Sequence, residues 1–186
     1  MRLFLAIEIT DEVRGALAAL VQELRAMAPK AKWVRPENLH VTLKFLGTTE
    51  QDKLAAVREA LAAIRSPEPV TLEFRGLGFF PNGKRARVFW AGAESTANLR
   101  ALAGDIDLGM HLLGFPLEER SFTPHLTLAR FDPPGLPPKL ELAAEQHAPR
   151  VFGSLIAREF HLIESRLKPA GAEYTTLQSF PLAPEK

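Results

Sequence analysis

The chain has 186 residues, of which 46% are hydrophobic and 24% charged, a composition typical of one globular domain or of two small lobes that share a core. The net charge of +1 argues against a protein that coats long nucleic acid, but it permits a local site for one nucleotide or strand end. The chain has no cysteine, which excludes disulfides, thiolate chemistry and cysteine-based zinc sites, and no apolar run approaches the roughly 20 residues of a membrane helix.

The first half of the chain predicts alternating strands and helices. Residues 2–9 read as a strand, and because Glu8 interrupts the apolar stretch and no cleavage site follows, we expect no signal peptide. The absence of cysteine fits a cytoplasmic location. Apolar residues at helical spacing follow from Asp11 and stop at Pro29. Thr48, with Gln51 three residues later, predicts a capped start for a second helix. Further strands are expected over residues 32–34, 40–46 and 70–80.

The second half continues this alternation. Turn residues 81–84 lead into a returning strand at 87–90, which predicts a hairpin. After it we expect, in order, a helix over 95–113, a strand over 122–129, a proline-rich loop over 132–138, a short helix to about 146, and two strands over 152–167 and 173–182. Strands and helices mixed with hairpins indicate an α+β fold, and no linker divides residues 1–186 into independent domains.

A weak internal duplication is the most informative feature of the sequence. His40-Val41-Thr42-Leu43 recurs as His125-Leu126-Thr127-Leu128, and both copies lie in predicted strands. Because residues two apart on a strand share a face, each copy presents a histidine and a threonine side by side. Two such strands related by a pseudo-twofold axis would bring two imidazoles together.

That arrangement suits phosphoryl chemistry. Opening a cyclic phosphodiester needs a base that deprotonates water and an acid that protonates the departing ribose oxygen, and histidine can perform either task near neutral pH. Two threonine hydroxyls can donate to the non-bridging phosphate oxygens. We expect no metal, because no Asp, Glu or Cys ligand set accompanies the two histidines. One His-x-Thr on a strand is usually structural, whereas two matched copies give a catalytic role the same weight as a structural one.

Two long signatures resemble those of the two-histidine phosphoesterases, and more narrowly the RNA 2′,3′-cyclic phosphodiesterases, also called 2′-5′ RNA ligases or LigT-like proteins. The first runs from Trp33 to Gly47 and the second from Phe122 to Arg130. The resemblance also covers residues 2–7, 86–90 and 165–174, and therefore nearly the whole chain. Residues 132–150 match nothing in the family pattern.

The resemblance implies two pseudo-symmetric lobes, each an antiparallel sheet with helices on the outside, around a central cleft, in a single two-lobed domain. It implies hydrolysis of an RNA or nucleotide 2′,3′-cyclic phosphate to a 2′-phosphate, with a weak reverse 2′-5′ ligation. No cofactor is implied. The partners are RNA ends or nucleotides with a cyclic phosphate, including tRNA fragments, and we expect a monomer that contacts no membrane.

Carried over by residue, His40 is the general acid and His125 the base, while Thr42 and Thr127 hold the phosphate. Arg130 either adds positive charge at the cleft edge or is a solvated strand-end arginine. Phe45 either stacks on a base or, with more weight, belongs to the core. The same two interpretations, a base platform or with more weight the core, apply to Trp33, Phe89 and Trp90. Lys44 is expected to be solvated, and we expect surface or core positions for His111, His147 and His161.

Two other functions remain open at this point. The first is a two-histidine phosphoesterase with another substrate, such as a 2′-5′ oligonucleotide. The second is a non-catalytic protein that binds RNA ends, although a pure binder has no need of two titrating imidazoles.

Overall fold

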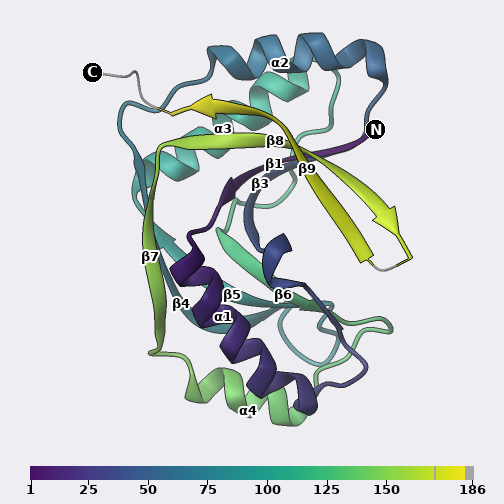
Figure 1. The fold of residues 1–186 in the computed structure, drawn as a ribbon, viewed down its shortest axis with the longest axis vertical. Helices are drawn as coiled ribbons and strands as arrows, with labels where there is room; N and C mark the ends of the chain where they lie inside the picture. Colours follow the sequence, from purple (N-terminus) through teal and green to yellow (C-terminus); the bar gives the residue numbers. More distant parts are fainter. Residues whose placement is uncertain (170, 183–186) are drawn as a thin grey trace.

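Nine strands form one antiparallel sheet in the computed structural model, which describes residues 1–169 and 171–182 (Figure 1). The strands are β1 (Arg2–Glu8), β2 (Lys32–Trp33), β3 (His40–Thr48), β4 (Val70–Phe80), β5 (Val88–Ser95), β6 (His125–Arg130), β7 (Val151–Ala157), β8 (Glu159–Lys168) and β9 (Gly171–Pro181). The helices are α1 (Asp11–Leu24), α2 (Leu54–Ala63), α3 (Ala97–Leu112) and α4 (Pro138–Gln146), with short 3₁₀ turns η1 (Arg25–Met27), η2 (Pro36–Asn38) and η3 (Gln51–Lys53). The predicted α+β class is confirmed.

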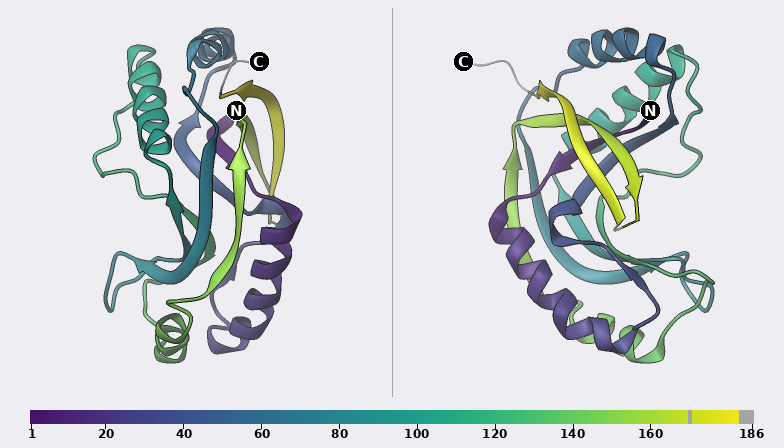
Figure 2. Two further views of the ribbon diagram at one scale, coloured as in Figure 1. Left: turned by 90° about the vertical axis from the view of Figure 1, so that its left-hand side faces the viewer. Right: turned by 45° about the vertical axis from the view of Figure 1, so that its right-hand side comes forward.

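The sheet has two halves of matching order. Its path runs β7-β4-β5-β6-β3-β1-β8-β9, so that four strands lie on each side of the junction between β6 and β3. Helices α1 and α4 contact β7 and β4 in one half, whereas α3 and α2 contact β3 and β9 in the other. Figure 1 shows these two pairs of helices at opposite ends of the molecule, and Figure 2 shows the strong curvature of the sheet between them. The two antiparallel sheets expected from sequence therefore meet edge to edge and form one curved sheet.

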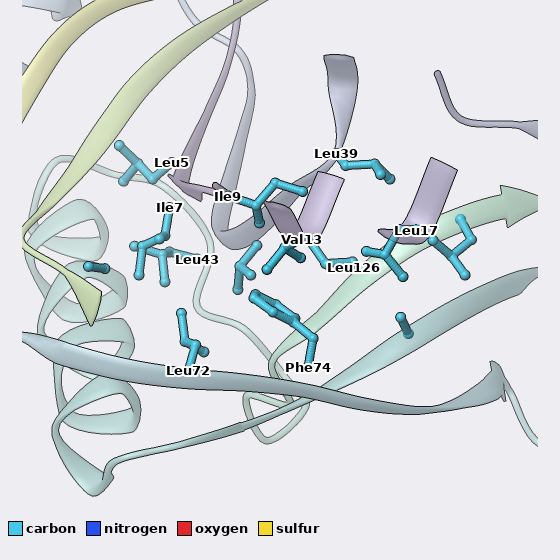
Figure 3. Close-up of a cluster of buried hydrophobic side chains, with 14 of the residues drawn as sticks. Leu5, Ile7, Ile9, Val13, Leu17, Leu39, Leu43, Leu72, Phe74 and Leu126 are labelled. Atoms are coloured by element: carbon cyan, nitrogen blue, oxygen red, sulfur yellow. The ribbon is translucent and has the colours of Figure 1, made fainter. Parts of the chain in front are cut away.

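The main core lies between one face of this sheet and the helices. Figure 3 shows Val13 and Leu17 of α1 packed with Leu43 of β3, Phe74 of β4 and Leu126 of β6. All five side chains are buried. Because the two motif strands alternate, burying Leu43 and Leu126 on this face leaves the motif histidines and threonines for the opposite face.

The start of α2 differs from its prediction. Thr48 is the last residue of β3 and pairs with Arg2 of β1, so that it does not cap a helix. The chain passes through turn η3 before α2 begins at Leu54, and no side chain caps that start. By contrast, α1 begins where expected, with Thr10 accepting a hydrogen bond from the Val13 amide at 3.4 Å.

The strand predicted over 152–167 is two strands. β7 and β8 are separated at Arg158; β7 pairs with β4 at one edge of the sheet, and β8 pairs with β1 in the other half. No proline or glycine marks this break, so the local pattern offers no stop signal. Ala170, in the turn predicted before the last strand, lies outside the described residues. Among the described helices, none combines the length and apolarity that a bilayer crossing requires.

Candidate active site

The two copies of the motif lie on neighbouring strands at the centre of the sheet. Val41 of β3 pairs with Leu126 of β6 in antiparallel register. The residues on either side of this pair are therefore opposite one another, with His40 across from Thr127 and Thr42 across from His125. All four polar side chains are half-buried, whereas Val41 and Leu126 are fully buried. We call the surface that carries these four side chains the motif face.

Matching β-bulges follow the two motifs. On β1, Leu5 pairs with Lys44 and Ala6 with Thr42, which leaves Leu43 without a partner. On β5, Phe89 pairs with Ala129 and Trp90 with Thr127, which leaves Leu128 without one. Each bulge adds one residue to its strand and so shifts the alternation of faces beyond it.

The bulges determine on which face of the sheet the side chains of Lys44, Phe45 and Arg130 lie. Because of the shift, Phe45 and Arg130 return to the motif face, and each lies five residues after its histidine. Phe45 is 54% exposed, so its assignment to the core is wrong. Lys44 turns to the opposite face and is only 2% exposed, so the prediction of a solvated lysine is also wrong. Its ammonium donates to Asp107 and to the Pro116 carbonyl.

Each histidine is held by the backbone two residues before it. The Nδ1 atom of His40 lies 2.7 Å from the carbonyl oxygen of Asn38, and Nδ1 of His125 lies 2.7 Å from that of Thr123. Since a carbonyl oxygen can only accept, Nδ1 carries a proton in both rings. In the neutral state Nε2 is then the unprotonated nitrogen, available to take a proton or, once protonated, to give one.

Aromatic rings surround both imidazoles. Phe4 and Tyr174 lie 4.7 and 5.4 Å from the His40 ring, between centroids, and Tyr174 meets it edge-on. Phe80 lies 5.1 Å from the His125 ring, also edge-on. Phe4, Tyr174 and Phe80 come from β1, β9 and β4, far from the motifs in sequence. Sequence reasoning missed the role of all three, because an isolated aromatic residue in a predicted strand carries no signal of its own.

Trp90 belongs to the motif face, which corrects its assignment to the core. It pairs with Thr127 on one side and with Gly78 on the other. Its indole lies across Gly78, where a Cβ atom would overlap the ring, and also passes close to Gly92. The ring of Phe80 lies 5.0 Å from that of Trp90, so the flat indole supports the aromatic contact on His125. Phe89 is buried and Trp33 packs at the edge of the main core, as predicted.

Burial and charge set the protonation of the two histidines. Burial lowers the pKa of His40 from 6.5 to about 4, against the effect of its hydrogen bond to Asn38 and with a further lowering by the positive charge of Arg130. Burial also lowers the pKa of His125, and Arg130 adds to this lowering. Both imidazoles are therefore neutral at pH 7 in the free protein. The positive charge of Arg130, an exposed residue at the end of β6, thus affects both rings.

A cavity of about 400 Å³ adjoins His40 at one end of the motif face. It lies between the end of β1, the turn η2 and the first part of β9, and Tyr174 forms part of its wall. His125, Thr42 and Thr127 do not line it. Across residues 1–169 and 171–182, no three His, Asp or Glu side chains gather as metal ligands do.

Comparisons with known proteins agree with this geometry. A family model described as LigT like phosphoesterase matches residues 7–90 and 92–174, so that each matched segment contains one copy of the motif. An RNA 2′,3′-cyclic phosphodiesterase of Archaeoglobus fulgidus is 34% identical over 180 residues, which are 97% of this chain and 99% of the relative.

Solved structures show the same fold. A crystal structure of a protein from Thermus thermophilus matches with a TM-score of 0.82 and 33% identity over the whole of both chains. E. coli LigT in complex with 3′-AMP matches with a TM-score of 0.77 and 27% identity over 97% of each chain.

Proposed function

The chain belongs to the LigT-like phosphoesterase family, and on this premise we propose that it hydrolyses the 2′,3′-cyclic phosphate of an RNA end or a nucleotide to a 2′-phosphate without a metal ion. The observation that carries the proposal is the matched pair of imidazoles. His40 and His125 lie on adjacent strands, each with Nδ1 bound to a backbone carbonyl and each across from a threonine. This arrangement leaves Nε2 of each ring available, so that the two histidines can act as an acid–base pair on one phosphate.

In the proposed reaction the phosphate lies between the four motif side chains. His125 accepts a proton from water through Nε2 as the water oxygen attacks phosphorus. The bond from phosphorus to the ribose 3′ oxygen breaks, and the protonated Nε2 of His40 donates its proton to that oxygen. The 2′ ester bond remains, so that the product is a 2′-phosphate, and the two histidines recover their starting states by exchange with solvent.

The threonines and Arg130 stabilise charge during this step. The hydroxyls of Thr42 and Thr127 donate to the non-bridging oxygens, where negative charge increases in the transition state. Arg130 supplies positive charge without a titrating proton. Because both histidines are neutral in the free protein, the acid acquires its proton as the phosphate binds, since a nearby anion raises an imidazole pKa.

The same groups can join two RNA ends, which is the reverse of cleaving a 2′-5′ bond to a cyclic phosphate. If a 5′-hydroxyl of a second RNA replaces water, the pair joins the two ends through a 2′-5′ bond, and tRNA fragments are substrates of that kind. We propose this as a weak activity of a monomeric, cytoplasmic protein.

The test uses adenosine 2′,3′-cyclic phosphate in the presence of EDTA. We expect turnover to adenosine 2′-phosphate, identified by chromatography against the 3′ isomer, and loss of that turnover in the His40→Ala and His125→Ala variants. Loss of activity in EDTA that a divalent ion restores would contradict the metal-independent mechanism. Turnover of a 2′-5′ dinucleotide alone would indicate the other phosphoesterase, and binding without turnover would indicate a protein that only recognises RNA ends.

A further inference from the structure

The cavity beside His40 lies outside the position of the reacting phosphate. Of the four motif side chains only His40 lines it, and the remaining wall comes from β1, α1, η2, β8 and β9 and the residues next to them. A ligand that fills this cavity is therefore adjacent to the proposed leaving oxygen but separate from the group that reacts.

The wall of the cavity combines three kinds of chemistry. Leu39, Ile163 and Tyr174 form an apolar part, Glu8 and Glu173 provide carboxylate acceptors, and two arginines provide positive charge. A ribonucleotide has the same three parts, because it joins a flat base to sugar hydroxyls and an anionic phosphate. At about 400 Å³ the cavity is within the usual range for small-ligand sites.

The two arginines differ in their availability to a ligand. Arg14 is bound to its own chain, since its guanidinium donates to the Pro36 carbonyl at 2.8 Å and to the Ile9 carbonyl at 3.1 Å. Arg35 is 45% exposed, and in the described part of the chain its one ion pair is a loose contact of 3.7 Å with Glu37. The planar donor fork of Arg35 can therefore bind a phosphate in a bidentate arrangement.

The start of β9 leaves room for Arg35. Gly171 has φ +119°, and a Cβ atom there would lie 3.3 Å from Nη2 of Arg35. Asn38 of η2 binds the same part of β9 by donating to the Ala172 carbonyl at 2.8 Å. The guanidinium of Arg35 thus lies beside the start of β9, which is hydrogen-bonded to η2, at the cavity wall.

We propose that this cavity binds the nucleotide that precedes the cyclic phosphate in an RNA strand, with Arg35 bonding the phosphodiester between the two nucleotides. The inference rests on the proposed function. A nucleoside 2′,3′-cyclic phosphate has a single phosphate, which the motif residues hold, and so leaves Arg35 without an anion. An RNA end brings a second phosphate.

The charge of Arg35 decides whether this cavity can bind a phosphate. Glu8, Glu37 and Glu173 place three carboxylates around the cavity, of which Glu173 is paired with Lys168 at 2.9 Å. The other two repel a phosphate unless a cation offsets them. Removal of Arg35 should therefore disfavour a strand end much more than a mononucleotide.

The test compares three substrates: adenosine 2′,3′-cyclic phosphate, its 5′-phosphorylated form, and the dinucleotide ApA with a terminal 2′,3′-cyclic phosphate. For the parent protein we expect kcat/KM for the dinucleotide to exceed that for the unphosphorylated mononucleotide by about tenfold or more, the usual effect of one charge-assisted hydrogen bond. The 5′-phosphorylated form should lie between the two, because it offers the phosphate without the base and sugar.

Substitutions then test whether Arg35 causes the preference for the dinucleotide over the mononucleotide. Arg35→Ala should bring the dinucleotide-to-mononucleotide ratio close to one, and Arg35→Lys should restore part of it. Glu37→Gln should raise the ratio, since it removes the competing carboxylate. Arg100→Ala, at an exposed position of α3 away from the cavity, is the matched control and should keep the parent ratio.

Salt dependence gives a second measure. In the parent protein, a plot of the logarithm of kcat/KM against the logarithm of salt concentration should have a steeper negative slope for the dinucleotide than for the unphosphorylated mononucleotide. The two slopes should differ by about 0.7, the value for one extra phosphate contact on a single strand. Arg35→Ala should remove this difference. Equal kcat/KM for all three substrates, or a preference that survives in Arg35→Ala, would overturn the inference while leaving the proposed function intact. No turnover of any of the three would instead contradict the proposed function.

Discussion

Lys44 and Asp107 form a buried ion pair beneath the first motif strand. The ammonium of Lys44, 1% exposed, lies 2.5 Å from an Asp107 carboxylate oxygen, and that carboxylate also accepts from the Glu118 amide. The pair joins β3 to α3 and to the start of the segment that leads to His125. It therefore connects the chain around one motif to the chain before the other.

Lys44→Met should lower the free energy of unfolding by about 2–4 kcal/mol. Removal of one partner leaves the other charge without compensation, and the 20% exposure of Asp107 moderates the cost. Urea denaturation measures the change, with Lys30→Met at an exposed position as the control. The double variant Lys44→Met, Asp107→Leu should recover part of the loss, because it leaves no unpaired charge. An unfolding midpoint equal to that of the parent would show that the pair does not stabilise the fold.

Replacement of either histidine by alanine should lower kcat by a factor of about 10²–10⁴, the usual effect of one positioned proton-transfer group. His40→Ala and His125→Ala test this, and the double variant should lose much less than the product of the two, because the groups act as a unit. Thr42→Ala and Thr127→Ala should each cost less, since each removes one neutral hydrogen bond. Melting temperatures must match that of the parent. A stable histidine variant with only a few-fold loss of rate would rule out the mechanism.

The activity should have a bell-shaped pH dependence with its kcat/KM maximum below pH 6.5. The acid must carry a proton and the base must not, and burial lowers the pKa of both His40 and His125 below the ordinary value. As pH rises through the upper pKa the acid loses its proton, and as pH falls through the lower one the base gains a proton. The two apparent values belong to the coupled pair. A maximum above pH 7 would contradict the assigned shifts.

Inorganic phosphate should raise the pKa of both imidazoles. An anion between the rings stabilises their protonated forms, by about 1–3 pH units for close opposite charges. Titration of the ring resonances by NMR, with and without phosphate, measures the change; the His40→Gln and His125→Gln variants assign the signals. The pKa of His111, an exposed residue of α3, serves as the control. Equal titration curves in both conditions would place the phosphate elsewhere.

Gly78→Ala should disturb the support of His125. The new Cβ atom would overlap the Trp90 indole, which must then tilt away from the sheet and displace Phe80. We expect a loss of about 1–3 kcal/mol of stability from overpacking, together with reduced turnover. In a Trp33→Phe background the fluorescence of Trp90 should also change. Gly104→Ala in α3, where a Cβ atom meets nothing, should preserve both turnover and fluorescence. An unchanged Trp90 spectrum in Gly78→Ala would show that the indole does not depend on the glycine.

Local periodicity in the sequence was enough to predict the α+β class, most of the elements and the pairing of His40-x-Thr42 with His125-x-Thr127. A strand repeats every two residues, and this period places each histidine and threonine on one face whatever surrounds them. The prediction of β4 over residues 70–80 succeeded for the same reason, and the short helix predicted to about residue 146 corresponds to α4.

The surroundings of the two histidines depend instead on how distant strands pair. The bulges at Leu43 and Leu128 arise because the partner strand has no residue that pairs with either leucine. No feature of the sequence within β3 or β6 predicts them. Because of these bulges, the Lys44 side chain lies on the face of the sheet that packs against the core, whereas Phe45 and Arg130 lie on the motif face. The aromatic contacts likewise join strands distant in sequence. A two-residue period is a property of one strand, whereas register, bulges and the break between β7 and β8 are properties of its neighbours.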